Sequence, residues 1–123
     1  ATETPIASMP QSETAAALAA WAKIEFAGRD DVAISGPLAF DLALSEASAQ
    51  IKGLVNDKVA GRANCLLMPE IVAGNFLYKA FVYLAGACAA GLVVGGSVPV
   101  LLTSRADPPA ARLASIALAA VSR

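Results

Sequence analysis

Hydrophobic residues recur along this chain in two alternating patterns. Stretches in which apolar residues return every three or four positions predict helices over about 13–27, 38–51, 74–89 and 108–121. Short, continuous apolar runs between them predict buried strands over 32–35, 64–68, 92–94 and 98–102. Because helices alternate with such strands, we predict a three-layer α/β/α architecture with a mostly parallel sheet.

Residues typical of turns and helix caps lie near these boundaries. Ser12 is expected to cap the first helix, and Gly28 to stop it. Pro37 suits the first position of the second helix. Asp107 and Pro108 predict a cap and a first-turn proline for the last helix.

No charged residue occurs between Ala80 and Ser104. That stretch exceeds the length of about 18 residues needed to span a bilayer, so a membrane segment is one interpretation. Glycines and a proline interrupt it, which favours the end of a helix followed by two buried strands and a turn. We therefore expect no membrane segment.

Composition narrows the function classes. A chain of 123 residues with 57% hydrophobic and 15% charged residues is expected to be folded, as one domain or part of a larger one. The net charge of −1 and scattered basic residues argue against nucleic-acid binding. Without histidine, Ser-His and Cys-His dyads and the usual zinc sites are excluded, and we expect neither metal nor cofactor.

Location and assembly follow from similar reasoning. Cys65 and Cys88 lie in apolar runs and are expected to be buried, reduced thiols rather than a disulfide. The N-terminal residues do not resemble a signal peptide, so a cytoplasmic location is expected. The high apolar content predicts a partner, either another domain or a second subunit in a homodimer.

Two junctions between predicted strands and helices carry candidate chemistry. At the first, Asn75 and Lys79 lie four residues apart at the expected start of a helix, whose free N–H groups would favour an anion. The alternative is that Asn75 caps the helix and Lys79 is solvated. At the second, Thr103, Ser104 and Arg105 leave a strand just before a helix, where the guanidinium could hold a phosphate or carboxylate. The alternative for Arg105 is an ordinary surface ion pair.

Several motifs occur together in one order. They are VAGRANCLLMP at residues 59–69, continuing to AGN and YK at 73–79, GPLAFD at 36–41, and TSRAD at 103–107. In this combination the chain resembles the C-terminal part of the phosphate acetyltransferase and phosphate butyryltransferase family. The resemblance covers roughly residues 31–121.

The resemblance implies a two-domain fold like that of isocitrate and isopropylmalate dehydrogenases, with the active site between the domains. It implies the interconversion of acyl-CoA plus phosphate with acyl phosphate plus CoA. By motif match Ser104 and Arg105 would be catalytic, and Gly74, Asn75, Lys79 and Thr103 would bind substrate. Arg105 would neutralise the phosphoryl group.

Two departures from the family pattern matter. The carboxylate that deprotonates the CoA thiol in the acetyl branch has Ala111 at its matching position, while Asp107 is nearby. The N-terminal half of the family has no counterpart here, so we expect a fragment, inactive alone, of a longer protein; some relatives are fused to an enoyl-CoA hydratase-like domain. A non-catalytic module that senses acyl-CoA, or one that only dimerises, remains the alternative.

Overall fold

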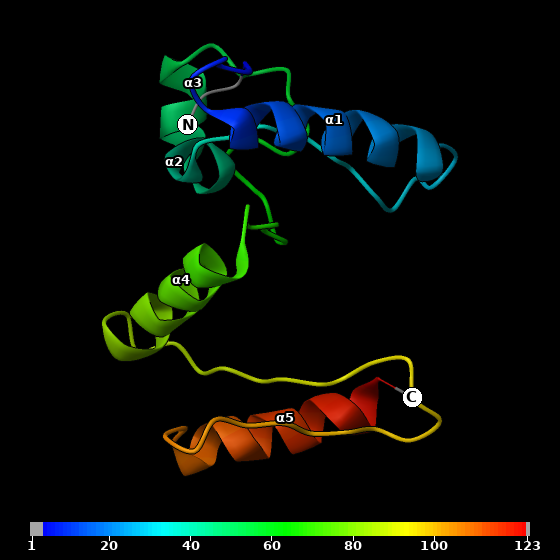
Figure 1. Cartoon of the computed structure of the whole chain (residues 1–123), viewed down its shortest axis with the longest axis vertical. Coiled ribbons are helices and arrows are strands. Elements are labelled where there is room, and N and C mark those ends of the chain that lie inside the picture. Colours follow the sequence, from blue (N-terminus) through cyan, green and yellow to red (C-terminus); the bar gives the residue numbers. More distant parts are fainter. Residues whose placement is uncertain (1–3, 123) are drawn as a thin grey trace. The chain divides into compact units, whose positions relative to one another are not determined.

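The structure is a computed structural model that describes residues 4–122, so residues 1–3 of the chain's start and residue 123 lie outside the described part. Two compact units divide the chain, Ala1–Pro69 and Glu70–Arg123. The helices of the described residues are α1 (Pro10–Glu25), α2 (Phe40–Leu44), α3 (Glu46–Ile51), α4 (Ile71–Tyr83) and α5 (Pro109–Val121) (Figure 1).

The predicted strands are not formed within residues 4–122. The segments expected as strands are extended or irregular, and the ladder contact among them is one antiparallel bridge between Val93 and Val100. A strand needs a neighbour to accept and donate its backbone hydrogen bonds, and the expected parallel neighbours do not pair here. The mostly parallel sheet, the three layers and the dehydrogenase-like fold are therefore not confirmed.

The first unit packs around small residues. Leu42 is completely buried, and apart from Pro37 the other buried apolar side chains described in this unit are alanines, including Ala19 of α1 and Ala49 of α3. The single helix predicted over 38–51 is two helices, because Ser45 has an extended backbone and its hydroxyl caps α3 by accepting the N–H of Ser48 at 3.2 Å.

The loop after α3 is fixed to α2 by backbone hydrogen bonds. The N–H of Gly61 donates to the carbonyl of Leu42 at 2.7 Å, and the N–H of Ala63 donates to that of Ala43 at 2.9 Å. Gly61 has a φ of +81°, and a Cβ there would lie 2.6 Å from the Cα of Glu46. This position therefore requires glycine both for its left-handed backbone and for its close approach to α3.

Asp57 holds the same loop from the other side. Its carboxylate accepts the N–H groups of Val59 at 2.7 Å and Ala60 at 2.9 Å, and it also accepts the hydroxyl of Ser35. Partial burial would raise the pKa of Asp57, but the hydrogen bonds from Ser35 and the two N–H groups together lower it. The carboxylate is therefore charged at neutral pH and ties the loop to the segment before the Gly36–Pro37 cis peptide.

The start of α1 differs from the prediction. The helix begins at Pro10 with Met9 as its N-cap, so Ser12 lies inside the first turn instead of capping it. The Ser12 hydroxyl is buried, accepts the N–H of Ile6 at 2.8 Å and donates to the carbonyl of Met9 at 2.6 Å. Ser12 thus folds the preceding segment onto the helix rather than satisfying helical N–H groups.

Helix α4 begins and ends earlier than predicted. Its N-cap is Glu70, whose carboxylate accepts the N–H groups of Val72 at 2.7 Å and Ala73 at 2.6 Å. Asn75 is therefore not the cap. The helix ends at Tyr83 instead of near residue 89, and the chain then turns through Gly86 with a φ of +68°.

Helix α5 buries a stripe of small residues, Ala111, Ser115 and Ala119, spaced four apart. The extended segment before it runs along the helix (Figure 1), and the N–H of Gly91 donates to the Ser115 hydroxyl at 3.0 Å. The N-cap of α5 is Pro108, with no side-chain cap, so the expected capping role of Asp107 is wrong.

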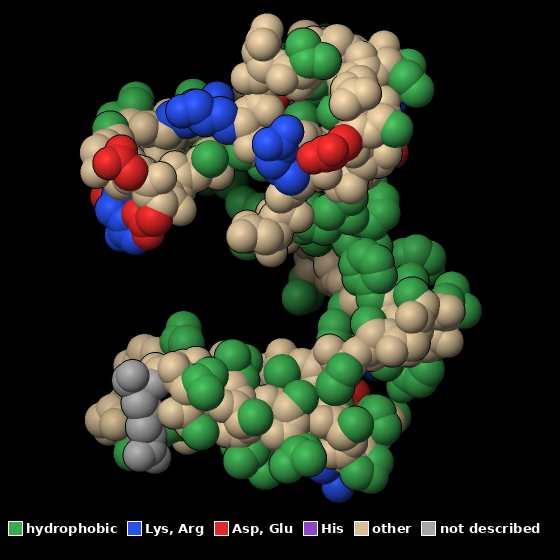
Figure 2. All heavy atoms as spheres, turned by 180° about the vertical axis from the view of Figure 1, so that it is seen from behind, with side chains coloured by type: hydrophobic (Ala, Val, Ile, Leu, Met, Phe, Trp, Pro, Cys, Tyr) green, Lys and Arg blue, Asp and Glu red, His purple; other side chains and the backbone are tan. Residues whose placement is uncertain are grey.

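Two expectations of burial are also wrong. Cys65 and Cys88 are free, as expected, but both are exposed. Hydrophobic side chains cover much of the surface of the second unit (Figure 2), and in the uncharged stretch Val94 is 82% and Leu102 76% exposed. No sheet forms among residues 4–122 that could cover these side chains. No helix among residues 4–122 combines the length and apolar character that crossing a membrane requires.

Candidate functional site

A pocket of about 580 Å³ lies in the second unit, between α4, α5 and the loops that join them. Thr103, Ser104 and Arg105, the residues of the second predicted junction, all line it. The other polar side chains of its wall belong to Tyr78, Asp107 and Ser115, and the apolar part comes from residues 89–91, 102 and 111. The structure therefore brings the hydroxyl pair and the arginine together beside a carboxylate and two further hydroxyls.

The Ser-Arg pair sits on a tight turn, Ser104 to Asp107. The N–H of Asp107 donates to the carbonyl of Ser104 at 3.1 Å, which closes the turn from the backbone side. The Asp107 carboxylate closes it a second time, because Oδ2 accepts the N–H of Ser104 at 2.7 Å. Arg105 is the first of the two central residues and is exposed.

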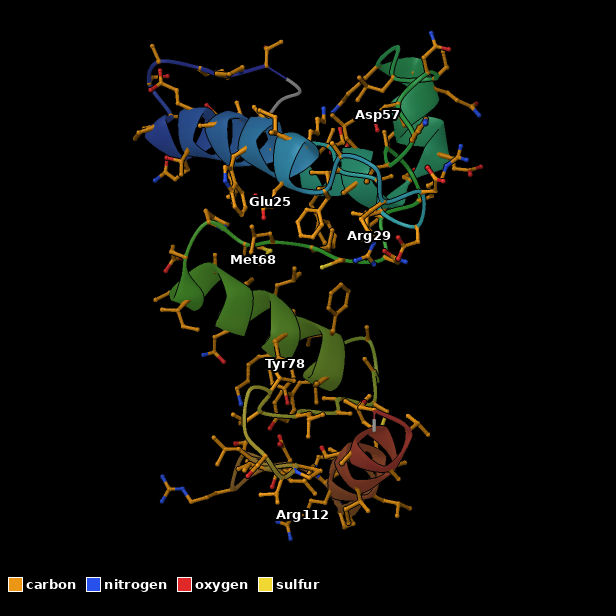
Figure 3. All side chains as sticks on the ribbon, turned by 90° about the vertical axis from the view of Figure 1, so that its right-hand side faces the viewer. Glu25, Arg29, Asp57, Met68, Tyr78 and Arg112 are labelled. Carbon is orange, nitrogen blue, oxygen red and sulfur yellow. The ribbon has the colours of Figure 1, made fainter. Side chains whose placement is uncertain are left out.

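Tyr78 connects this turn to α4. Figure 3 shows its side chain pointing from the helix toward the loops that precede α5. Its hydroxyl donates to Oδ1 of Asp107 at 3.5 Å, the long limit of a hydrogen bond. Burial raises the pKa of Tyr78, and the negative charge and hydrogen bond of Asp107 raise it further. Tyr78 is therefore protonated at neutral pH, and its one proton is donated to Asp107.

Small residues form the wall that α5 contributes. Ser115 is only 1% exposed, and its hydroxyl donates to the carbonyl of Ala111 at 2.8 Å while accepting the N–H of Gly91. Ala111 is buried and lines the pocket with a methyl group. The wall is thus neutral at position 111.

Arg105 supplies the positive charge of the pocket. Among residues 4–122 the ion pairs join other partners, in the pairs Arg29–Asp31, Lys52–Asp41 and Arg62–Glu46. The guanidinium of Arg105 has no ion-pair partner within this part of the chain. An exposed, unpaired guanidinium at a pocket can form two parallel hydrogen bonds to a phosphate or carboxylate.

The residues of the first junction lie on α4 but not in the pocket wall. Gly74, Asn75 and Lys79 are absent from its lining, and Asn75 is in the second turn of the helix instead of the first. The helix start is already occupied by the carboxylate of Glu70, so the argument for an anion site at that N-terminus does not hold. The Lys79 ammonium lies 5.7 Å from the ring centres of both Tyr78 and Tyr83.

Sequence reasoning missed three of the six polar residues of the pocket: Tyr78, Asp107 and Ser115. Tyr78 and Ser115 are ordinary helix residues, and Asp107 resembles a helix cap. A signal for Ser115 existed in the spacing of small residues along α5. In the part of the chain that the structure describes, no group of three or more Cys, Asp and Glu residues could hold a metal ion.

Comparison with known proteins gives consistent results. The model of the phosphate acetyl/butaryl transferase family matches residues 6–120. A phosphate acetyltransferase of Rhizobium meliloti is 47% identical over 124 residues, which cover 98% of this chain and 37% of that protein. A phosphate butyryltransferase of Clostridium acetobutylicum is 50% identical over 88 residues, 72% of this chain and 29% of that protein.

A solved structure agrees with the sequence relatives. The crystal structure of a branched-chain phosphotransacylase from Enterococcus faecalis V583 matches with a TM-score of 0.78 and 34% identity, covering 98% of this chain and 42% of that one. The chain thus spans well under half the length of these relatives. By the family match and these identities, the chain belongs to the phosphate acetyl/butyryl transferase family.

Proposed function

We propose that the protein containing this chain transfers an acyl group, acetyl or butyryl, between coenzyme A and inorganic phosphate. The observation that carries the proposal is the unpaired guanidinium of Arg105 beside the hydroxyls of Thr103 and Ser104 in one pocket. Such a group of fixed donors suits a phosphate better than an uncharged ligand. Relatives named phosphate acetyltransferase and phosphate butyryltransferase support the acyl phosphate product.

The proposed reaction needs neither metal nor cofactor. A phosphate oxygen attacks the carbonyl carbon of the thioester, a C–O bond forms, the C–S bond breaks, and the thiolate of CoA leaves. Arg105 would hold the phosphate and balance its charge, while the Ser104 hydroxyl donates to an oxygen that gains charge. Gly74, Asn75 and Lys79 remain proposed substrate-binding residues by their motif alone.

Proton transfer to the thiolate is the step for which this chain has no obvious acid or base at the expected position. A carboxylate at position 111 would be close to the reacting atoms, but the residue there is Ala111. The pocket still holds the neutral hydroxyl of Tyr78, whose raised pKa keeps it protonated at neutral pH. That hydroxyl already donates to Asp107, and its raised pKa makes it a weaker acid than a thiol. We therefore propose that water supplies the proton to the thiolate.

The same Ala111 favours a second candidate. A module that binds acyl-CoA and senses it, without turnover, would keep the arginine and the hydroxyls and could lose the carboxylate. Release of CoA thiol from acetyl-CoA or butyryl-CoA, with and without phosphate, separates the two in the full-length protein. Phosphate-dependent release supports the transferase, whereas saturable acyl-CoA binding without release supports the sensor.

We further propose that these 123 residues alone lack activity, because they span 37% or less of the curated relatives described above. Turnover by the isolated chain near a typical enzymatic rate, on the order of 10 per second, would contradict this. We also propose a cytoplasmic homodimer, in which the exposed apolar side chains of the second unit are covered. Light scattering of the full-length protein at micromolar concentration tests the dimer, and cell fractionation tests the location.

A further inference from the structure

We infer that Asp107 is a positioning residue, which holds the Ser104–Arg105 turn in its binding geometry by hydrogen bonds to Ser104 and Tyr78. The inference rests on the proposed function, because the turn presents the arginine proposed to bind phosphate. This role differs from helix capping. The structure excludes capping by Asp107, because the N-cap of α5 is Pro108.

The first step of the argument is the placement of the Asp107 side chain. The residue is 9% exposed, precedes α5 and lines the pocket. A buried carboxylate is stable only where donors replace the water that it has lost. The donors here are the Ser104 N–H at 2.7 Å and the Tyr78 hydroxyl at 3.5 Å.

The second step concerns the two ends of this connection. One donor belongs to the backbone of the turn, so the hydrogen bond fixes the direction in which Arg105 leaves the chain. The other donor belongs to α4, a 13-residue helix that also carries Lys79. Asp107 therefore joins two elements of the second unit, and loss of its carboxylate would free the turn from α4.

The third step is electrostatic. A carboxylate two residues after an arginine could neutralise it, but no ion pair joins Asp107 and Arg105 among the pairs in residues 4–122. The Asp107 carboxylate accepts hydrogen bonds from neutral donors, the Ser104 N–H and the Tyr78 hydroxyl. The positive charge of the Arg105 guanidinium is therefore available to a ligand. The arrangement thus fixes the backbone of Arg105 without competing for its side chain.

Two substitutions separate positioning from proton transfer. Asp107→Ala removes every acceptor. Asp107→Asn keeps an oxygen for the Ser104 N–H, and its amide N–H can donate to the Tyr78 oxygen, but it cannot take up a proton as a carboxylate does. Asp57→Asn is the matched control, because Asp57 also fixes a loop by three hydrogen bonds and does not line the pocket.

The experiment measures kcat and the KM values for phosphate and acyl-CoA in the full-length protein. We expect Asp107→Ala to raise the phosphate KM about tenfold with the acyl-CoA KM within about twofold, and Asp107→Asn to stay within about threefold of wild type. Asp57→Asn should change neither the KM for phosphate nor the KM for acyl-CoA. An Asp107→Asn variant as impaired as Asp107→Ala, with kcat reduced, would make Asp107 a proton-transfer group and overturn the inference. Unchanged kinetics in Asp107→Ala would overturn it as well.

Hydrogen exchange of the peptide covering residues 102–108 keeps this test independent of activity. If the wild type has no transferase activity, the proposed function fails. Hydrogen exchange still tests whether Asp107 holds the Ser104–Arg105 turn to α4. Faster exchange of this peptide in Asp107→Ala, with Asp107→Asn close to wild type, supports the positioning role. Equal exchange in all three proteins contradicts it.

Discussion

The carboxylate of Asp107 and the backbone N–H of Ser104 lie 2.7 Å apart, across a turn that carries the exposed Arg105. The sequence places an aspartate before a proline at this point, which is typical of a helix start. In the structure the carboxylate faces backward along the chain, into the pocket. A residue expected to stabilise α5 thus shapes the site that precedes it.

The ionisation of Tyr78 should depend on Asp107. Burial raises the pKa of Tyr78, and the charge of Asp107 adds to the effect, so Asp107→Asn should lower this pKa toward the ordinary value of about 10. The pKa of Tyr78 is higher in the folded state than in the unfolded state. The contribution of the protonated Tyr78 hydroxyl to the free energy of unfolding is therefore present below about pH 10 and is lost as pH rises through the folded-state pKa. Ultraviolet titration with Tyr83→Phe as background isolates the signal. A pKa of Tyr78 that does not change in Asp107→Asn contradicts the contact.

Gly61 should tolerate no side chain. A Cβ there would lie 2.6 Å from the Glu46 Cα, and the φ of +81° disfavours other residues. We expect Gly61→Ala to lower the free energy of unfolding by about 3 kcal/mol, of which roughly 1 comes from the backbone and about 2 from the clash.

Gly53 is the matched control for this change. Its φ is +79°, but a Cβ there would meet no atom within 4 Å. Gly53→Ala should therefore lower the free energy of unfolding by only about 1 kcal/mol. Denaturant unfolding of both variants measures the difference, and equal effects would show that the approach to Glu46 does not matter.

Asp57→Asn should destabilise the first unit by about 1–2 kcal/mol at neutral pH, because a neutral amide replaces an acceptor of three hydrogen bonds. The pKa of Asp57 is lowered in the folded state, so its contribution is present above the unfolded value of about 3.9 and is lost as pH falls through the folded value. Unfolding measured between about pH 2 and 7 should show wild type and variant converging in acid. A constant difference at every pH would count against this account.

Glu70 should matter for the start of α4. Its carboxylate satisfies the N–H groups of Val72 and Ala73, so Glu70→Ala should lower the free energy of unfolding by about 1 kcal/mol. Glu70→Asn should recover most of the loss, since asparagine is a good N-cap. If both variants unfold like wild type, the cap contributes nothing.

Local sequence pattern accounts for most helix positions but not for their ends. Pro108 precedes a second proline, Pro109, which disfavours helical backbone at the residue before it, so Pro108 is extended and the helix begins one residue later. This effect moves Asp107 out of the capping position. Glu70 was not expected as a cap because glutamate is a less usual residue there than the asparagine five positions later.

The strands could not be predicted reliably from the pattern because their formation depends on partners. Runs such as 64–68 and 98–102 have the composition of buried strands, yet hydrogen-bonded neighbours decide whether a sheet forms. In the site, the consecutive residues Thr103, Ser104 and Arg105, singled out by the sequence motif, all line one pocket. Tyr78, more than twenty positions away, joined them only through the packing of the second unit.

The central claim is that Arg105 binds the phosphate on which acyl transfer depends. It is tested most directly by the kcat/KM for phosphate in full-length Arg105→Gln, Arg105→Lys and Arg112→Gln. Arg112 is an exposed arginine of α5 outside the pocket wall, so its variant should match wild type. We expect Arg105→Gln to lose about a hundredfold, roughly 2.7 kcal/mol, and Arg105→Lys to recover part of it. A value for Arg105→Gln within about threefold of wild type, roughly 0.6 kcal/mol, would contradict the account.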